Sequence, residues 1–283
     1  MRFVNFMNEG RATLGVRDGN DVRVLGTEPL ESILARGIDL VQWTLSHASE
    51  EKLPMEGLQL LPPLQRPPKI LCVGLNFADH TKESNFEQPA YPTLFLRVNT
   101  SLVAHDQPMI RPSVTDSDGL DFEGEIAVVI GRGGRHIAKD DALSHVAGYS
   151  LFNDGSVREY QFKTPQWTVG KNFDATGAFG PDLITPDELP AGVKGLLLET
   201  RVNGEVVQSA NTDEMVFDVA SLISIISEAI TLEPGDVIVS GTPAGIGWAR
   251  TPKLLMKAGD VCEVSVEGMG TLSNVIADER PIR

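Results

Sequence analysis

The acidic segment 121–125, Asp-Phe-Glu-Gly-Glu, runs directly into the apolar residues 126–130. This β-branched run predicts a strand, and side chains two residues apart on a strand point to the same face. Asp121, Glu123 and Glu125 would therefore project together from the exposed end of the strand, where carboxylates repel one another unless water or a cation neutralises them. Carboxylate oxygens without a nearby cysteine or histidine pair favour a hard cation. The segment thus indicates a site for Mg²⁺ or Mn²⁺, with a solvated acidic strand end as the alternative.

A second group of residues has the spacing of an acid–base pair. His80 and Glu83 lie three residues apart in a stretch that predicts one or two helical turns, so their side chains would meet on one face. A carboxylate that binds one nitrogen of an imidazole leaves the other nitrogen free as a base. An ordinary surface pair is the alternative.

A third group follows the predicted strand 148–153. Asp154 ends this strand, Arg158 lies one helical turn beyond it, and Gln161 follows three residues later. Asp154 would bring another hard oxygen ligand to a metal, and the two later side chains would share one face of a short helix. The alternative is a helix cap beside an ordinary charge pair.

Composition and charge limit what the chain can be. Of its 283 residues, 41% are hydrophobic and 22% are charged, as in an ordinary globular protein. A net charge of −15 without a basic stripe argues against nucleic-acid binding, and an anionic substrate would need local positive charge from a metal or buried Arg or Lys. No apolar run approaches the roughly 20 residues that span a membrane, and no signal-peptide pattern is seen. Cys72 and Cys262 lie in separate apolar runs, which excludes a disulfide framework and favours a reducing cytoplasm.

The elements that would position these groups are mainly short strands. Residues 1–28 predict an antiparallel hairpin unit, and residues 29–50 show the apolar spacing of helix. The proline-rich connector 61–68 disfavours both strand and helix. We therefore expect a small N-terminal α/β domain over residues 1–66 and a larger domain over residues 67–283.

The larger domain contains one clear helical pattern, at about 216–230, with Asp213 as the expected N-cap. Strands are expected at 70–74, 237–240, 261–266 and 271–276. Because strands dominate without the regular strand–helix alternation of a doubly wound sheet, the expected fold class is mixed α/β and β-rich.

Five sequence blocks, in this order, resemble those of the fumarylacetoacetate hydrolase family. They are Gly-Leu-Asn-Phe-x-x-His-x-x-Glu at 74–83, Asp-Phe-Glu-Gly-Glu at 121–125, Asn-Asp-x-Ser-x-Arg-x-x-Gln at 153–161, Gly-Lys-Asn-Phe-Asp at 170–174 and Gly-Thr-Pro-Ala-Gly at 241–245. The resemblance extends from about Ile70 to the C-terminus. It implies the family's β-roll catalytic domain, usually as a homodimer, with one Mg²⁺ or Mn²⁺ per subunit.

Matched by position, the resemblance implies roles for ten residues. These are the metal ligands Glu123, Glu125 and Asp154, the catalytic groups His80, Glu83 and Lys171, and the substrate contacts Arg158, Gln161, Thr242 and Arg97. Two positions depart from the family's usual pattern. Glu159, next to Arg158, stands where the family usually has an aspartate, and Arg97 stands where a lysine is commoner. Both differences would tune which acid binds.

The resemblance implies an enzyme, and our first expectation is a metal-dependent hydrolase of catabolism. It would cleave the C–C bond of a 2,4-diketo acid of the acylpyruvate type, sugar-acid-derived substrates included, to give pyruvate and a carboxylic acid. The alternative is an isomerase or decarboxylase of a 2-oxo dicarboxylic acid, such as a hydroxymuconate-type isomerase or an oxaloacetate decarboxylase. A metal-dependent binding module for small dicarboxylates is the third hypothesis. In each case we expect a small anionic 2-oxo acid as ligand, a cytoplasmic homodimer, and no nucleic-acid or membrane partner.

Overall fold

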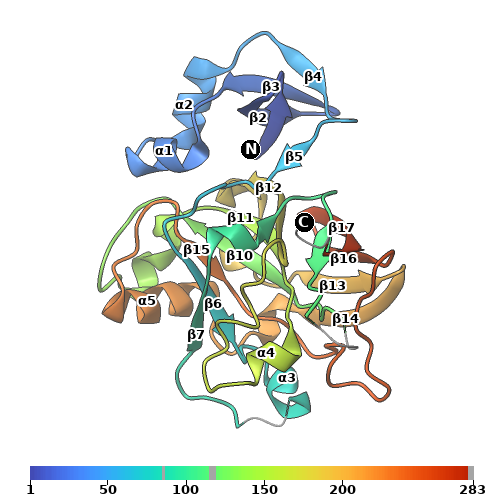
Figure 1. Cartoon of the computed structure of the whole chain (residues 1–283). Helices are drawn as coiled ribbons and strands as arrows, with labels where there is room; N and C mark the ends of the chain where they lie inside the picture. Colours follow the sequence, from blue (N-terminus) through green and yellow to red (C-terminus); the bar gives the residue numbers. More distant parts are fainter. Residues whose placement is uncertain (85–86, 115–118, 280–283) are drawn as a thin grey trace.

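The computed structural model describes residues 1–84, 87–114 and 119–279, and strands dominate its architecture (Figure 1). The mixed α/β, strand-rich fold expected from the sequence is confirmed. The N-terminal hairpin lies at one end of the molecule, and the short helices α3 and α4 lie together at the opposite end (Figure 1).

Within the described residues, the larger sheet contains twelve strands. Its continuous path runs through β4 (Lys52–Pro54), β3 (Asp21–Gly26), β2 (Arg11–Asp18), β1 (Arg2–Asn8), β12 (Gly177–Ile184), β11 (Val146–Asp154), β10 (Gly124–Ile130), β15 (Val237–Val239), β6 (Ile70–Gly74) and β7 (Thr93–Arg97). Two short strands pair beside this path, β5 (Leu60–Leu61) with β1 and β8 (Leu102–Val103) with β12.

The smaller sheet packs against the start of β10. Its order is β14 (Glu205–Asn211), β13 (Leu197–Val202), β16 (Val261–Val266), β17 (Gly270–Asp278) and β9 (Met109–Arg111). A Cβ atom at Gly124 would lie 2.1 Å from the hydroxyl of Thr200 on β13, so glycine is required where the two sheets meet. Since side chains alternate along a strand, Glu123 and Glu125 point away from the smaller sheet.

The helices are short and connect the strands. The α-helices are α1 (Leu30–Ala35), α2 (Leu40–His47), α3 (Ala78–Glu83), α4 (Arg158–Gln161) and α5 (Val219–Ala229). The 3₁₀ turns are η1 (Asn99–Ser101), η2 (Lys139–His145), η3 (Pro186–Glu188), η4 (Ala191–Val193) and η5 (Thr212–Glu214). The helical pattern over 29–50 is thus split into two helices, between which Gly37 has a φ of 66°. Across the described ranges, no helix has the length and apolar character needed to cross a membrane.

The N-terminal residues share a sheet and a core with the rest of the chain. Strand β1 pairs with β12 through Phe3 and Leu183, and Phe3 packs in one buried cluster with Phe152 of β11. The expected boundary between residues 66 and 67 falls in the irregular segment between β5 and β6. The division into two domains stays a prediction.

The longest helix, α5, begins later than its apolar pattern predicted. Its N-cap is Asp218, whose carboxylate accepts the backbone N–H and the hydroxyl of Ser221 at 2.8 and 2.6 Å. Asp213, the cap expected from the sequence, lies in η5 and accepts the N–H of Gly195. That expectation was wrong because both aspartates precede the apolar stripe, and only the path of the backbone decides which one meets the first turn.

We predict that Asp218→Ala lowers the free energy of unfolding by about 1 kcal/mol, the usual cost of losing an N-cap. Burial raises the pKa of Asp218, but the hydrogen bonds from Ser221, together with Lys194 and Lys139, outweigh it and bring the pKa to about 2, below the reference value of 3.8. The contribution is therefore present above the unfolded-state pKa and disappears as the pH falls toward the folded-state value. Urea unfolding at neutral and acidic pH measures it. Asp213→Ala is the control, and an equal loss in the two variants would contradict the assignment of the cap.

Candidate active site

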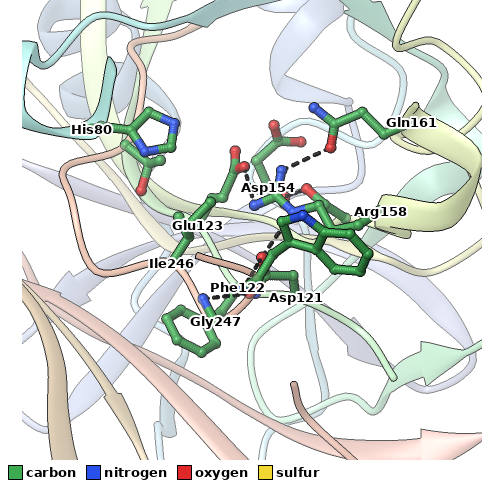
Figure 2. Close-up of polar contacts among 12 residues, drawn as sticks. His80, Asp121, Phe122, Glu123, Asp154, Arg158, Gln161, Ile246 and Gly247 are labelled. Atoms are coloured by element: carbon green, nitrogen blue, oxygen red, sulfur yellow. Dashed lines mark hydrogen bonds and ion pairs between the residues drawn. The ribbon is translucent and has the colours of Figure 1, made fainter. Parts of the chain in front are cut away.

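Side chains from distant parts of the chain line one cavity of about 280 Å³. The predicted site residues that line it are His80 and Glu83 from α3, Glu123 just before β10 and Glu125 within it, Arg158 and Gln161 from α4, and Lys171 and Thr242 from loops. Asp154 and Arg97 lie behind this lining and are buried. Figure 2 shows His80 on one side of Glu123, with Arg158 and Gln161 on the other.

The three predicted metal ligands meet where β10 begins and the neighbouring strand β11 ends. Gly124 pairs with Asn153, and the N–H of Asp154 donates to the carbonyl of Glu123 at 2.8 Å. One carboxylate oxygen from each of Glu123, Glu125 and Asp154 lies within 4.8 Å of the others. Glu125 is only 2% exposed, so the expectation of an exposed strand end was wrong. The register of the two strands thus builds a buried carboxylate triad.

Two cationic side chains of the cavity lining neutralise part of this charge. The Lys171 ammonium lies 2.7 Å from Glu123 and 2.6 Å from Asp154. Arg158 lies 2.6 Å from the other oxygen of Glu123, and it donates to Gln161 at 2.7 Å. Although burial alone would raise the pKa of Glu123, the charges of Lys171 and Arg158 hold it well below its usual range.

Glu125 has a different environment. Its carboxylate accepts the N–H of Gly241, and the structure records no ion pair for it among the described residues. Burial, and then the charges of Asp154 and Glu123, raise the pKa of Glu125 well above its usual range. The triad therefore lacks positive charge at Glu125, and a hard divalent cation fits both this deficit and the all-oxygen donor set.

Asp121 does not join the triad, contrary to the pattern read from the sequence. It precedes β10 in an isolated bridge with Ser156, so strand alternation does not extend to it. Its carboxylate accepts from Arg158 at 2.8 Å and from the N–H groups of Gly247 and Trp248 at 2.8 and 3.1 Å (Figure 2). Asp121 thus fixes Arg158 against the glycine loop, which spans residues 241–247.

The structure places His80 and Glu83 in contact on one face of α3. His80 Nδ1 lies 3.0 Å from Glu83, and both oxygens of Glu83 accept the N–H of Gly245 at 2.9 Å. Gly245 has a φ of 107°, and a Cβ there would lie 2.3 Å from the carbonyl of Val207, so only glycine suits the position. With Nδ1–H donating to Glu83, Nε2 remains as the acceptor on the cavity side.

The two remaining substrate contacts expected from the resemblance differ in their surroundings. Thr242 lines the cavity, donates to the carbonyl of Gly124 at 3.0 Å and accepts from Gln208 at 2.9 Å. Arg97 is absent from the described cavity lining, and its guanidinium binds Asp154 from behind. A substrate contact therefore stays a prediction for Thr242 and finds no support for Arg97.

Sequence reasoning missed the apolar wall of the cavity. It is formed largely by Phe95, Phe162, Trp167, Ile246 and Trp248. A Cβ at Gly74 would lie 2.3 Å from the ring of Trp167, so this indole lies directly against the end of β6. Two of these residues could have been found from the sequence, because Phe162 directly follows the predicted site residue Gln161 and Trp248 directly follows the glycine loop.

Comparison with known proteins gives consistent matches. Residues 69–277, which include all five sequence blocks, match the family described as fumarylacetoacetate (FAA) hydrolase, C-terminal. The chain is 41% identical over 227 residues to the mitochondrial oxaloacetate tautomerase FAHD2A of Homo sapiens, covering 79% of this chain and 71% of that protein. Its structure matches a fumarylacetoacetate hydrolase from psychrophilic Exiguobacterium antarcticum with a TM-score of 0.87 and 36% identity, over 99% of this chain and 100% of the other. It also matches the 2-hydroxyhepta-2,4-diene-1,7-dioate isomerase of Mycobacterium marinum with a TM-score of 0.79 and 29% identity, over 99% of each chain.

Proposed function

Because the chain belongs to the fumarylacetoacetate hydrolase family, we propose that it interconverts the enol and keto forms of a small 2-oxo dicarboxylic acid with the help of a divalent cation. The observation that carries the proposal is the convergence of a carboxylate triad, two cations and a carboxylate-held histidine on one cavity. The human relative is named an oxaloacetate tautomerase, and the M. marinum protein an isomerase. These names support the alternative expected from the sequence more than the C–C hydrolase.

The polar end of the cavity suits an anionic 2-oxo acid. Glu123, Glu125 and Asp154 would hold Mg²⁺ or Mn²⁺, which when bound supplies Lewis acidity toward the oxygens of the substrate. Arg158 and Lys171 add fixed positive charge, and Gln161 presents an amide beside Arg158. These groups would overcome the repulsion between an anion and a chain of net charge −15.

His80 is the group best placed to move a proton. Conversion of the enol to the keto form removes a proton from the oxygen on C2 and adds a proton to C3. With Nδ1 bound to Glu83, Nε2 of His80 accepts the first proton, and the resulting imidazolium supplies the second. Glu83 stabilises that imidazolium, and the cationic side chains stabilise the negative charge of the deprotonated substrate. The exchange needs no oxidant and no further reactant.

The direct test follows the ultraviolet absorbance of enol-oxaloacetate as it converts to the keto form. We expect saturable acceleration by the protein with Mg²⁺ or Mn²⁺, and none after treatment with EDTA. Solutions of the metal salt without protein are the necessary control, since free cations also bind oxaloacetate. Rates equal to that control for oxaloacetate and for longer 2-hydroxy-dienedioic acids would reject the tautomerase.

A C–C hydrolase is the second candidate, because a histidine held by a carboxylate also suits the activation of water. The same preparation should then release pyruvate from a 2,4-diketo acid, which a coupled lactate dehydrogenase assay detects. Tight metal-dependent binding of these acids without turnover would favour the binding module instead.

The assembly and location expected from the sequence remain proposals. A homodimer is testable by light scattering of the purified chain. The name of the human relative places that protein in mitochondria, whereas the sequence favoured the cytoplasm for this chain.

A further inference from the structure

We propose that Arg97 is a positioning residue that fixes Asp154 from behind, so that one oxygen of this carboxylate faces the metal site. The inference rests on the proposed function only in taking the triad to hold a divalent cation.

Arg97 ends β7, and its side chain is completely buried. Its Nη1 binds Asp154 Oδ1 and donates to the carbonyl of Gly155 at 3.2 Å. Its Nη2 donates to the hydroxyl of Thr176 at 2.8 Å, and its Nε to the hydroxyl of Ser101 at 3.2 Å. Each guanidinium nitrogen therefore has a protein partner, which fixes the orientation of the planar group.

The fold makes room for this guanidinium beside Asp154. On the neighbouring strand β12, the residue that pairs with Asp154 is Gly177. A Cβ at Gly177 would lie 2.8 Å from both Nε and Nη2 of Arg97. The guanidinium thus occupies the space that a side chain at position 177 would fill, and the absence of that side chain is a condition for the contact.

The two oxygens of Asp154 consequently face in different directions. Oδ1 binds Arg97, which is absent from the described cavity lining, while Oδ2 lies 2.6 Å from the ammonium of Lys171, which belongs to it. Since a carboxylate is planar, holding Oδ1 also aims Oδ2 toward the cavity. A lysine at position 97 would supply a point charge but not the fork that also holds Thr176 and Ser101.

The test is the affinity of the purified protein for Mn²⁺, measured by calorimetry, with the electron paramagnetic resonance spectrum of the bound ion as a second readout. Arg97→Met should raise the Kd about 10–100-fold, the range typical of groups that orient metal ligands. Arg97→Lys should raise it less and should change the spectrum, because the charge stays while the orientation of Asp154 relaxes. Wild-type Kd and spectrum in both variants would overturn the proposal, as would tighter binding in both.

Arg17→Met is the matched control. Arg17 lies 2.7 Å from the buried Asp182 and lines a different cavity, so its loss should affect stability and not the Kd for Mn²⁺. An equal rise of Kd in this variant would show that general destabilisation explains the effect, and would also overturn the proposal.

Thr176→Val covers the case in which Arg97→Met does not fold. It removes one hydroxyl from the guanidinium and leaves Arg97 in place, so the Kd should rise by a smaller factor. An unchanged Kd and spectrum in Thr176→Val and Arg97→Lys together would count against positioning. Because Mn²⁺ binding is read without turnover, a wild-type protein inactive toward 2-oxo acids would reject the proposed function and leave this inference standing.

Discussion

Glu125→Gln is expected to lower the metal-dependent activity about 10³-fold while the protein still folds. Lewis-acid catalysis supplies several kcal/mol, and each ~1.4 kcal/mol corresponds to a factor of ten in rate. Glutamine keeps the volume of the side chain, and its carbonyl can still accept the N–H of Gly241. The measurement is kcat at saturating Mg²⁺ together with the Kd for Mn²⁺. Full activity with wild-type metal affinity would show that Glu125 is not a ligand.

The pH dependence of stability gives an independent check on the same variant. Burial, with Asp154 and Glu123, raises the pKa of Glu125 well above the reference value of 4.5. An acid whose pKa is raised by folding takes up a proton as the chain folds, so the metal-free wild type should lose stability as the pH rises from the unfolded-state pKa toward the folded-state value. Glutamine does not titrate. In EDTA, the stability advantage of Glu125→Gln should therefore grow with pH over that window and become constant below it. A stability advantage of Glu125→Gln that does not change with pH would contradict a raised pKa for Glu125 in the folded protein.

Contacts between residues close in sequence were predictable from spacing alone. His80 and Glu83 meet because residues three apart share a helical face, and Glu123 and Glu125 align because residues two apart share a face of a strand. The same rule failed at Asp121 because the pairing with β11 continues only to Glu123, whose carbonyl accepts the N–H of Asp154, whereas Asp121 lies in an isolated bridge. Local periodicity predicts contacts only as far as the element extends.

Contacts between residues distant in sequence depended on strand pairing that no local pattern encodes. Asp154 lies beside Glu123 because β10 and β11 pair in one particular register, and a shift of one residue would turn its side chain to the opposite face. The sequence offered Asp154 as a possible ligand and the resemblance assigned it that role, but neither revealed that Arg97 would lie behind Asp154 rather than in the cavity. That position follows from the neighbouring glycine of β12, which only the assembled sheet brings close.

His80→Ala is expected to lower kcat for tautomerisation about 10²–10⁴-fold, the usual contribution of a general acid–base group. His80 is 7% exposed, lines the cavity and has Nδ1 occupied by Glu83, so its other nitrogen is the one available for proton transfer. Substitution of Glu83 would be harder to interpret, because that carboxylate also holds the glycine loop through the N–H of Gly245. His80 is therefore the cleaner position to test.

The variant should keep the wild-type Kd for Mn²⁺, since His80 lies outside the carboxylate triad. Its matched control is His47→Ala on the N-terminal helix α2, which should leave kcat unchanged. Any metal-dependent decarboxylation of oxaloacetate offers an internal comparison, because release of CO₂ from the chelated acid requires no base and should fall much less. Equal losses in both reactions would mean that His80 shapes the site or positions the substrate. Unchanged tautomerisation at wild-type metal affinity would exclude His80 from proton transfer and would direct attention to Lys171, whose ammonium lines the cavity and contacts Glu123 and Asp154.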